Sequence, residues 1–389
     1  MKIIIFSPYY PPHIGGVEFY AEEMNRYLIK SHNLTIFTPR LPTNSSQEEF
    51  LYDNKITITR FPAFEIIPNY PLPKLWTITF WKLFLSLFSQ KFDLTISHTR
   101  FFNTSLLALL YSKVKKIKWL HIEHGSDFVK SGGNLTTFLA KLYDYTIGVL
   151  ILRLADKVVA VSKKSASFCN ILTKSKSTCT TVIHRGINLE KLDRITPSEK
   201  INKKYPEKTV LIFIGRLING KGLTDLFHAL NKIITNDKQA QIVCLIVGNG
   251  PQKEELERLS AKLNLTNIVK FLGEQRPAKT ISLLKASDIF INPSYTEGLP
   301  TTVLEAAACG KAIIATDVGG TNQIITNNKS GYLTEPKNIK QLTSKLIDLI
   351  TNPDKIKLFG CNARQATKKN FVWEGAMKRY ETTLKNITK

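Results

Sequence analysis

The chain has 389 residues, of which 43% are hydrophobic, and a usual domain size of about 100 to 200 residues predicts two domains, each with its own core. Its five cysteines are odd in number and form no C-x-x-C pair, which favours a reducing compartment over a disulfide-stabilised secreted protein. The apolar run at the N-terminus is too short for a signal peptide, so we expect a cytoplasmic protein.

The net charge of +23 is divided almost evenly along the chain. Residues 1–200 contain 26 Lys and Arg against 15 Asp and Glu, and residues 201–389 contain 28 against 16. The sequence has no helix-turn-helix, RNA-recognition or zinc-finger signature, so we expect no nucleic-acid partner. A general positive field favours phosphorylated substrates or an anionic membrane surface, although solvated surface lysines explain the same charge equally well.

Apolar runs of strand length alternate with amphipathic helical stretches from end to end, which predicts parallel sheets with helices on both faces. In the first half we expect strands at residues 3–6, 34–38, 56–60, 94–97, 117–122, 157–161 and 181–183. In the second half we expect them at 210–214, 242–247, 268–271, 289–292 and 312–315. The polar, proline-marked segment 193–208 predicts a linker, so the expected domains are 1–195 and 205–370, followed by a helix at 371–389.

Residues 72–88 are unusually rich in aromatic side chains and include Lys74 and Lys82. The segment is shorter than the roughly 20 apolar residues that a membrane span needs. Two interpretations stay open. The segment is either a core helix packed on the sheet, or an interfacial helix with tryptophans towards a membrane or acceptor and lysines away from it.

Glycines and polar side chains follow several of the expected strands. The strand ends of this kind are 210–214 before Gly215 and Arg216, 242–247 before Gly248 and Gly250, 289–292 before Glu297, and 117–122 before His124. In open α/β sheets, ligands bind beyond the carboxyl ends of the strands. These residues are therefore candidates for a binding site.

The most informative segment is Glu297-Gly-Leu-Pro-Thr-Thr-Val-Leu-Glu305, which places two carboxylates eight residues apart around a turn and a helix start. Pro300 suits the first helical position. The amides that follow it, with the positive end of the helix dipole, form a phosphate site that Gly298 leaves open. Glu305 then lies at a depth that suits hydrogen bonds from ribose hydroxyls, while Glu297 stays on the loop and is free to face a sugar.

This segment resembles the E-x7-E motif of the retaining glycosyltransferases of family GT4, which have the GT-B fold. Three further segments resemble the same family in the expected order: Pro12-His-Ile-Gly-Gly-Val-Glu18, Gly215-Arg-Leu-Ile-Asn-Gly-Lys-Gly222, and Gly248-Asn-Gly-Pro251. The resemblance implies an α/β protein of two Rossmann-like domains whose parallel sheets face a central cleft. The C-terminal helix 371–389 would pack back on the first domain. A hexose-type sugar would pass from a nucleotide-diphosphate sugar on the second domain to a glycan or lipid-linked acceptor on the first.

The resemblance also assigns roles to individual residues. As catalytic residues it implies His124, facing the donor sugar, Glu297, and Arg216 and Lys221, whose charges would stabilise the leaving pyrophosphate. The residues expected to contact the donor are Gly16, Gly215, Gly250, Gly298, Leu299, Pro300, Thr301 and Glu305. Those expected near the acceptor are His13, Gly15 and Asp127, the last of which could instead orient His124.

We expect no metal ion and no other cofactor. The chain has no Asp-x-Asp motif, and His121 and His124 with Glu123 do not form a convincing ligand set because alternate residues of a strand point to opposite faces. Asn322-Gln323 replaces the Pro-Glu that usually follows the turn at 318–321 in the family, which removes a charge there.

Other functions fit parts of the pattern. A nucleotide-sugar epimerase shares the architecture, and a non-catalytic, membrane-associated sugar-binding protein would need the same pocket. A glycosidase could use Glu297 and Glu305 as its carboxylate pair. A dehydrogenase is disfavoured because Lys253 stands where a dinucleotide fingerprint has its third glycine.

Overall fold

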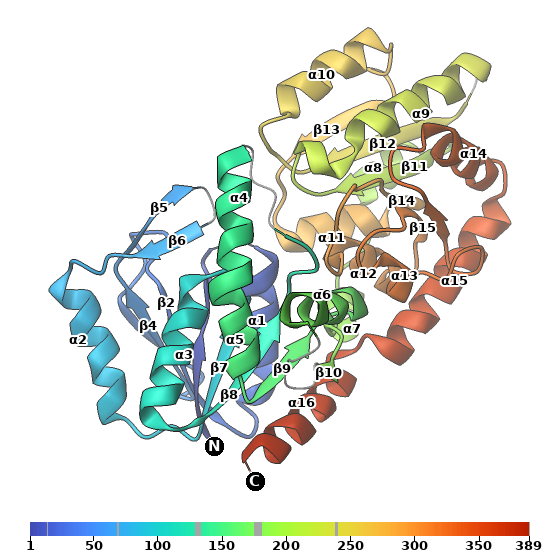
Figure 1. Ribbon diagram of the computed structural model, residues 1–389. Coiled ribbons are helices and arrows are strands. Elements are labelled where there is room, and N and C mark those ends of the chain that lie inside the picture. Colours follow the sequence, from blue (N-terminus) through green and yellow to red (C-terminus); the bar gives the residue numbers. More distant parts are fainter. Residues whose placement is uncertain (14, 68–69, 129–133, 175–180, 238–239, 389) are drawn as a thin grey trace. The chain divides into compact units, whose positions relative to one another are not determined.

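The computed structural model describes residues 1–389 except 14, 68–69, 129–133, 175–180, 238–239 and 389 (Figure 1). The chain divides into two compact units. Unit 1 comprises residues 1–185 and 373–389, and unit 2 comprises residues 186–372. The division lies ahead of the expected linker. Residues 193–208 belong to unit 2, and Ile201 in this segment is buried in the core of that unit.

Unit 1 is built on an eight-stranded sheet with the strand order β10-β9-β8-β7-β1-β2-β4-β3. The strands are β1 Lys2–Phe6, β2 Asn33–Pro39, β3 Glu48–Leu51, β4 Ile56–Phe61, β7 Leu94–His98, β8 Lys118–Glu123, β9 Lys157–Ala160 and β10 Thr181–Val182. All pair in parallel except β3, which runs antiparallel to β4. The antiparallel hairpin β5 Ala63–Ile67 and β6 Tyr70–Pro73 stands apart from this sheet.

Helices cover both faces of this sheet, because alternate strand residues point to opposite sides. In β1, Ile3 and Ile5 join one core, which α1 Gly16–Leu28 and α16 Trp373–Thr388 complete, whereas Ile4 and Phe6 join the other. Helices of the second core are α2 Ile78–Ser86, α3 Asn103–Lys115, α5 Val149–Leu154 and α6 Lys163–Thr173. The short η1 Leu87–Ser89 follows α2, and α4 Asn134–Tyr143 leads through η2 Asp144–Gly148 into α5.

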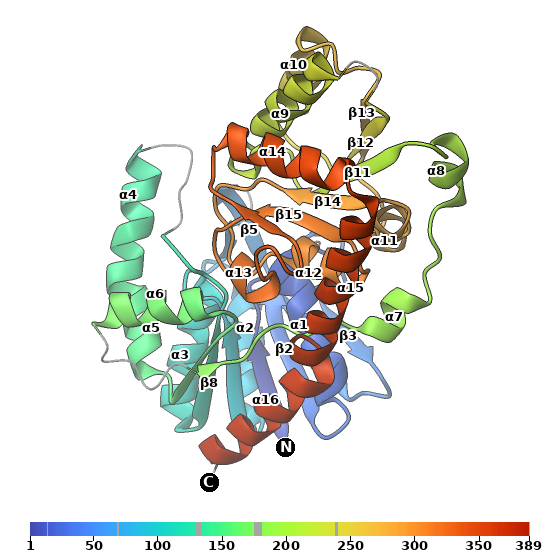
Figure 2. The same cartoon turned by 90° about the vertical axis from the view of Figure 1, so that its right-hand side faces the viewer.

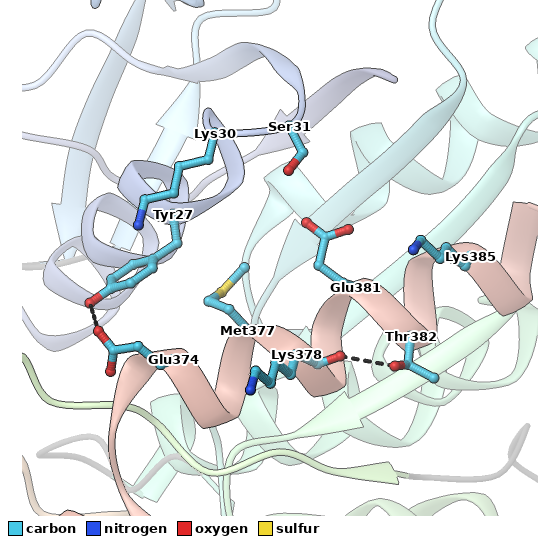
Figure 3. A pocket seen from close by; sticks show the side chains of 9 residues that line it. All are labelled: Tyr27, Lys30, Ser31, Glu374, Met377, Lys378, Glu381, Thr382 and Lys385. Carbon is cyan, nitrogen blue, oxygen red and sulfur yellow. Dashed lines mark hydrogen bonds between the residues drawn. The ribbon is translucent and has the colours of Figure 1, made fainter.

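The C-terminal helix α16 packs against α1 within unit 1. The Tyr27 hydroxyl donates to Glu374 Oε1 at 3.0 Å, and the Tyr20 and Tyr380 hydroxyls share a buried hydrogen bond. A hollow of about 440 Å³ lies between the two helices, lined by residues that include Lys30 and Glu381 (Figure 3). None of the expected site residues lines it.

Unit 2 contains a six-stranded parallel sheet with the order β13-β12-β11-β14-β15-β16. Its strands are β11 Thr209–Ile214, β12 Ile242–Val247, β13 Val269–Gly273, β14 Ile289–Asn292, β15 Ala312–Thr316 and β16 Tyr332–Thr334. The elements before the sheet are α7 Leu189–Asp193 and α8 Glu199–Lys204, and those within and after it are η3 Asn219–Lys221, α9 Leu223–Asn236, α10 Lys253–Lys262, α11 Pro277–Lys285, α12 Thr301–Ala308, α13 Thr321–Ile324, α14 Ile339–Ile350 and α15 Pro353–Asn370.

The helices of unit 2 also cover two faces of their sheet. One core contains Leu211 and Phe213 with residues of α9, α10 and α14, and the other contains Ile212 and Ile214 with residues of α11, α12 and α15. Figure 2 shows α14 and α15 as the helices of this unit that lie nearest the viewer. The expectation of parallel sheets covered by helices is confirmed in both units.

The aromatic segment 72–88 combines features of both interpretations. In α2 and η1, Phe80, Phe84 and Leu87 are buried in the core of unit 1. Ile78 and Trp81 on the same helix are 75% and 46% exposed. The segment is therefore a core helix whose outer face is also apolar. No helix in the described ranges is long and apolar enough to cross a membrane.

Candidate active site

The loop that follows β11 is fixed by a glycine with a left-handed backbone. Gly215 continues the sheet through a bond from its amide to the Val247 carbonyl at 3.0 Å, and the side chain of Arg216 is exposed. At the far end of the loop, Gly222 has φ +66°, and a Cβ there would overlap the Pro293 carbonyl. Only glycine fits both constraints, so the loop keeps Lys221 close to the chain that follows β14.

Lys221 and Glu297 form an ion pair at this edge of the sheet. The Lys221 Nζ lies 2.6 Å from Glu297 Oε1, and the Asn292 amide donates to the same oxygen at 3.5 Å. The two charged side chains are 23% and 12% exposed. A second contact joins the same loops, because the Tyr295 amide donates to the Gly220 carbonyl at 2.8 Å. Two of the expected catalytic residues are thus in direct contact, at the carboxyl ends of the neighbouring strands β11 and β14.

Helix α12 begins directly after this pair. The expectation that Pro300 is the first helical residue is wrong by one position: its ψ of 110° is extended, so it is the N-cap, and its carbonyl accepts from the Leu304 amide. The amides of a helix's first turn find no acceptor within the helix, and together with the dipole they favour an anion. Thr301 and Glu305, four residues apart, share a partly exposed face, while Val303 and Leu304 are buried.

The remaining donor residues of unit 2 line adjoining loops. Gly298 accepts at its carbonyl from the Gly320 amide at 2.6 Å, and Leu299 is partly buried against the core. Gly248 has φ +141°, and a Cβ on either Gly248 or Gly250 would overlap the backbone of the 215–217 loop. Close packing of the two loops is therefore enough to explain why residue 250 is a glycine. A contact between Gly250 and the donor stays a prediction.

His124 lies just beyond β8 in unit 1, beside a histidine that the sequence analysis did not single out. His98 Nδ1 lies 3.3 Å from His124 Nε2, and the edge-to-face ring of Tyr20 packs against His124 at 4.7 Å between centroids. Burial lowers the pKa of His98 well below its usual value. Burial likewise lowers the pKa of His124, to about 4, against the opposing charge of Glu123. Both imidazoles are therefore neutral at pH 7.

A buried ion network lies behind His124. Arg100 contacts Glu123 Oε1 at 3.0 Å and Asp144 Oδ1 at 2.9 Å, and all three side chains are at most 2% exposed. His121 is also fully buried and lies 3.3 Å from Glu123 and 2.8 Å from the Ser97 hydroxyl. In the described part of the chain, no group of three or more His, Cys, Asp or Glu residues is arranged to hold a metal ion.

The expected acceptor residues occupy the beginning of α1 and the loop after β8. His13 Nδ1 lies 2.7 Å from Glu18 Oε1, and its ring stacks on Tyr9 with 3.9 Å between centroids. Gly15 is the N-cap of α1, and Gly16, its first residue, has open space around the position of a Cβ. The exposed Asp127 accepts the Phe128 amide, so the described partner of His124 is His98 and not Asp127.

Comparison with known proteins identifies the family. Residues 14–191 match the model described as "Glycosyltransferase Family 4", and residues 195–366 match "Glycosyl transferases group 1". An uncharacterized glycosyltransferase of Methanocaldococcus jannaschii is 36% identical over 100% of this chain and 99% of its own length. The chain belongs to glycosyltransferase family GT4. It is therefore a transferase, and the expected enzyme class is confirmed.

Two further proteins are similar to this GT4 protein, one in sequence and one in fold. A Campylobacter jejuni protein is 29% identical over 69% of this chain and 73% of its own length; it is named N,N'-diacetylbacillosaminyl-diphospho-undecaprenol alpha-1,3-N-acetylgalactosaminyltransferase. The crystal structure of Anabaena HepE in complex with UDP-glucose superimposes with a TM-score of 0.75, at 20% identity, over 99% of this chain and 100% of that chain. The GT-B fold predicted from the sequence is confirmed.

Three residues of this GT4 enzyme that sequence reasoning did not select contact expected site residues within their own units. Asn292 contacts Glu297 in unit 2, and His98 and Arg100 surround His124 and Glu123 in unit 1. His98 and Asn292 are the last residues of β7 and β14. The rule that ligands bind beyond the carboxyl ends of strands could therefore have selected both, had it been applied to side chains within the strands.

We expect His98 to set the tautomer of His124. A hydrogen bond between His98 Nδ1 and His124 Nε2 requires a proton on one of these two nitrogens. His98 Nε2 is buried without a hydrogen-bond partner among the described residues. A buried N–H without an acceptor is rarer than an unfilled acceptor, so the proton should lie on His98 Nδ1. His124 would then carry its proton on Nδ1 and act as a donor. Two-bond ¹H–¹⁵N spectra of the histidine rings at pH 7.5 should show this tautomer.

Substitutions separate this role from a purely structural one. His98→Leu should lower kcat about fivefold, the equivalent of a hydrogen bond of about 1 kcal/mol, and should mix the His124 tautomers. His98→Asn, whose amide can still donate at that position, should restore both. A His124 ring protonated on Nε2 in the wild-type enzyme would contradict the assignment.

Proposed function

We propose that this GT4 enzyme is a retaining hexosyltransferase that uses a nucleotide-diphosphate sugar and requires no metal ion. The observation that carries the proposal is the Lys221–Glu297 pair, which lies at the carboxyl ends of β11 and β14 and directly before α12. A cation, a carboxylate and a helix N-terminus in one place suit a sugar diphosphate, because they serve its phosphates and its hydroxyls at once. The UDP-glucose held by the Anabaena structure supports this donor class.

The proposed chemistry follows from where charge develops. As the bond between the anomeric carbon and the diphosphate breaks, negative charge builds on the leaving phosphate, where Lys221, the exposed Arg216 and the first turn of α12 can stabilise it. The acceptor hydroxyl forms the new bond from the same face, and its proton passes to an oxygen of the departing phosphate. Retention of configuration is an expectation from the family. Glu297 would hold Lys221 in place and accept a hydrogen bond from a sugar hydroxyl.

The other site residues would bind the substrates. Glu305, on the partly exposed face of α12, is suited to accept hydrogen bonds from the ribose hydroxyls. His124 would donate to the transferred sugar, and the region around His13 in unit 1 would hold the acceptor. The acceptor is a glycan or a lipid-linked glycan, as the undecaprenol-diphosphate substrate in the name of the Campylobacter relative suggests. On this proposal the enzyme acts in polysaccharide or lipid-linked glycan synthesis, in the cytoplasm or peripherally on the inner face of the membrane.

Activity should persist in EDTA. The positive charge that a divalent ion would supply to the diphosphate is available from Arg216, Lys221 and the N-terminus of α12. Initial rates measured with 5 mM Mg²⁺ and with about 5 mM EDTA should agree within about twofold. Complete loss of turnover in EDTA that Mg²⁺ restores would contradict metal independence, without affecting the assignment of the donor site.

A thermal-shift screen against UDP-, GDP- and ADP-hexoses tests the donor class. A ligand present at 100 times its Kd stabilises the folded protein by about 2.7 kcal/mol, so the correct nucleotide should raise Tm clearly above the other two. Hydrolysis-resistant analogues keep the ligand intact during the measurement. If none of the three nucleotides shifts Tm, and no sugar transfer is detected with any of them, the proposed donor class is wrong.

A further inference from the structure

The helices on one side of unit 1 leave many large apolar side chains uncovered. Exposed fractions there reach 70% at Trp76, 75% at Ile78, 66% at Val114 and 62% at Phe138. The other residues of this kind in these helices and in the turn before α2, which also contains Trp76, are Leu75, Trp81, Leu85, Leu110, Leu139, Leu142, Tyr145, Leu150 and Leu154. In the rest of the described chain, exposed large hydrophobic residues are few and scattered. We call the surface formed by α2 with the turn before it, α3 and α4–α5 the apolar face.

The helices of the apolar face are neighbours. Lys115 Nζ on α3 donates to the Phe88 carbonyl after α2 at 2.8 Å, and Lys113 Nζ on α3 donates to the Leu154 carbonyl at the end of α5 at 2.9 Å. Figure 1 shows α2, α3 and α5 side by side, with α4 extending beyond α5. The inner sides of α2, α3 and α5 pack on the same core. The exposed residues are therefore the outer side of a single helical layer.

The apolar outer side of α2 is a defined stripe. Phe80, Phe84 and Leu87 face the core, whereas Ile78, Trp81 and Leu85, at spacings of three and four residues, form the opposite stripe. A surface helix of a globular protein normally has polar residues on that side, and contiguous exposed apolar surface marks an interaction site. Trp81 is also oriented, because its indole N–H donates to the Leu75 carbonyl at 2.7 Å.

The exposed charged side chains within the segments that form the apolar face are all basic. Residues 66–92 and 103–122 contain no Asp or Glu, while Lys74, Lys82, Lys91 and Lys113 lie within them. In 134–155 the one acidic residue is Asp144, which is fully buried against Arg100. Clustered lysines beside apolar side chains complement an anionic bilayer, whereas two copies of this face would bring like charges together.

We propose that the apolar face docks on an anionic phospholipid bilayer. Trp76, Ile78, Trp81 and Leu85 enter the boundary between headgroups and acyl chains, and the lysines contact lipid phosphates. The docking extends the proposed function. It depends on that function only for its purpose, which is to bring unit 1 to the membrane surface that holds a lipid-linked acceptor. The contact itself involves no donor and no turnover.

Tryptophan fluorescence gives a direct test with the full-length chain. The protein has four tryptophans, and Trp119 and Trp373 are at most 1% exposed. A change on vesicle binding therefore reports Trp76 and Trp81. With vesicles of 60% phosphatidylcholine and 40% phosphatidylglycerol, and no nucleotide, we expect a blue shift and co-sedimentation that weakens as salt rises. Vesicles of phosphatidylcholine alone should bind at least about tenfold more weakly.

Variants decide whether the apolar face is the contact. Trp76→Ser combined with Trp81→Ser should weaken co-sedimentation with the anionic vesicles by about tenfold or more. Leu358→Ser, a control at a residue of unit 2 that is 57% exposed, should bind like the wild type. Both proteins should stay folded, and the Tm of the double variant should fall only slightly, because Trp76 is 70% exposed and Trp81, 46% exposed, loses one hydrogen bond to Leu75.

Three outcomes would overturn the proposal: no binding to anionic vesicles at low salt, equal binding to neutral vesicles, or unchanged binding of the double variant. Concentration-dependent self-association that the tryptophan substitutions abolish would instead assign the face to a second copy, and would also overturn it. A failure of the proposed reaction is distinguishable, since it would leave vesicle binding intact and abolish only sugar transfer to a soluble acceptor.

Discussion

Lys221→Ala and Glu297→Gln should each lower kcat by about two orders of magnitude. Loss of one preorganised electrostatic contact from a transition state costs about 3 kcal/mol, which is roughly a hundredfold in rate. Lys221 supplies that contact to the leaving diphosphate, and Glu297 positions Lys221 through the 2.6 Å ion pair. Because both residues act as one unit, the double variant should be only slightly slower than either single variant.

The fold should survive these changes, because both side chains keep some access to water. Steady-state kinetics and circular dichroism on the same preparations provide the measurement. Lys355→Ala is a matched control: it breaks another ion pair of unit 2, with Asp348 at 2.9 Å, between α14 and α15, and should leave kcat unchanged. Near-normal kcat in both site variants would contradict the proposed role of the pair.

Arg100→Met should destabilise the protein by about 3–5 kcal/mol. The substitution leaves the carboxylates of Glu123 and Asp144 buried without their cation, and breaking a buried pair in this way costs about that much. Arg100 also stacks over the Phe168 ring, with its guanidinium carbon 4.7 Å from the ring centroid, so the variant loses packing as well. Urea unfolding at pH 7 measures the difference from the wild type.

The effect of Arg100→Met should depend on pH in a defined direction. Burial alone would raise the pKa of Glu123, but the charge of Arg100, together with a hydrogen bond from His121, holds it well below its usual value. In the wild type, the resulting stability is present above the unfolded-state pKa of about 4.3 and is lost as the pH falls through the folded-state value. The variant lacks this contribution. The difference in the free energy of unfolding between the two proteins should therefore shrink from pH 7 to pH 3.

Two further substitutions serve as comparisons for the destabilisation caused by Arg100→Met. Arg100→Lys keeps one charge but loses the planar fork that reaches both carboxylates, so its destabilisation should be intermediate. Arg194→Met removes an arginine that is 81% exposed and paired only at 3.9 Å with Glu190, and should change stability by less than about 0.5 kcal/mol. A loss below about 1 kcal/mol in Arg100→Met would show that the buried network does not contribute as proposed.

The fold class was predictable because several central parallel strands are buried on both faces and read as continuous apolar runs, as in β12 and β15. Short or edge strands lack this signal. β3 reads Glu-Glu-Phe-Leu and is half exposed, β6 contains two prolines, and β16 has three residues. Residues 193–208, which we expected to form a linker, belong to unit 2, because a polar segment can still insert one apolar residue, here Ile201, into a core.

The candidate site was predictable in its parts but not in its contacts. The strand-end rule located Glu297, and the family resemblance selected Lys221, which lies 76 residues earlier in the chain. Their ion pair depends on β11 and β14 being neighbours, and that strand order follows from packing that no local pattern encodes. The same applies to His98 and His124, which meet because β7 and β8 pair in register. Pro300 was misplaced by one residue, since its φ suits both the N-cap and the first helical position.

A crystal structure with a bound nucleotide-diphosphate sugar tests the central claim most directly. The diphosphate should lie between the 215–222 loop and the first turn of α12, with Lys221 Nζ within about 3 Å of a phosphate oxygen and Glu297 beside a sugar hydroxyl. The ribose should lie against Glu305. A diphosphate bound anywhere else on the chain, with Lys221 and Glu297 turned only towards each other, would contradict the account.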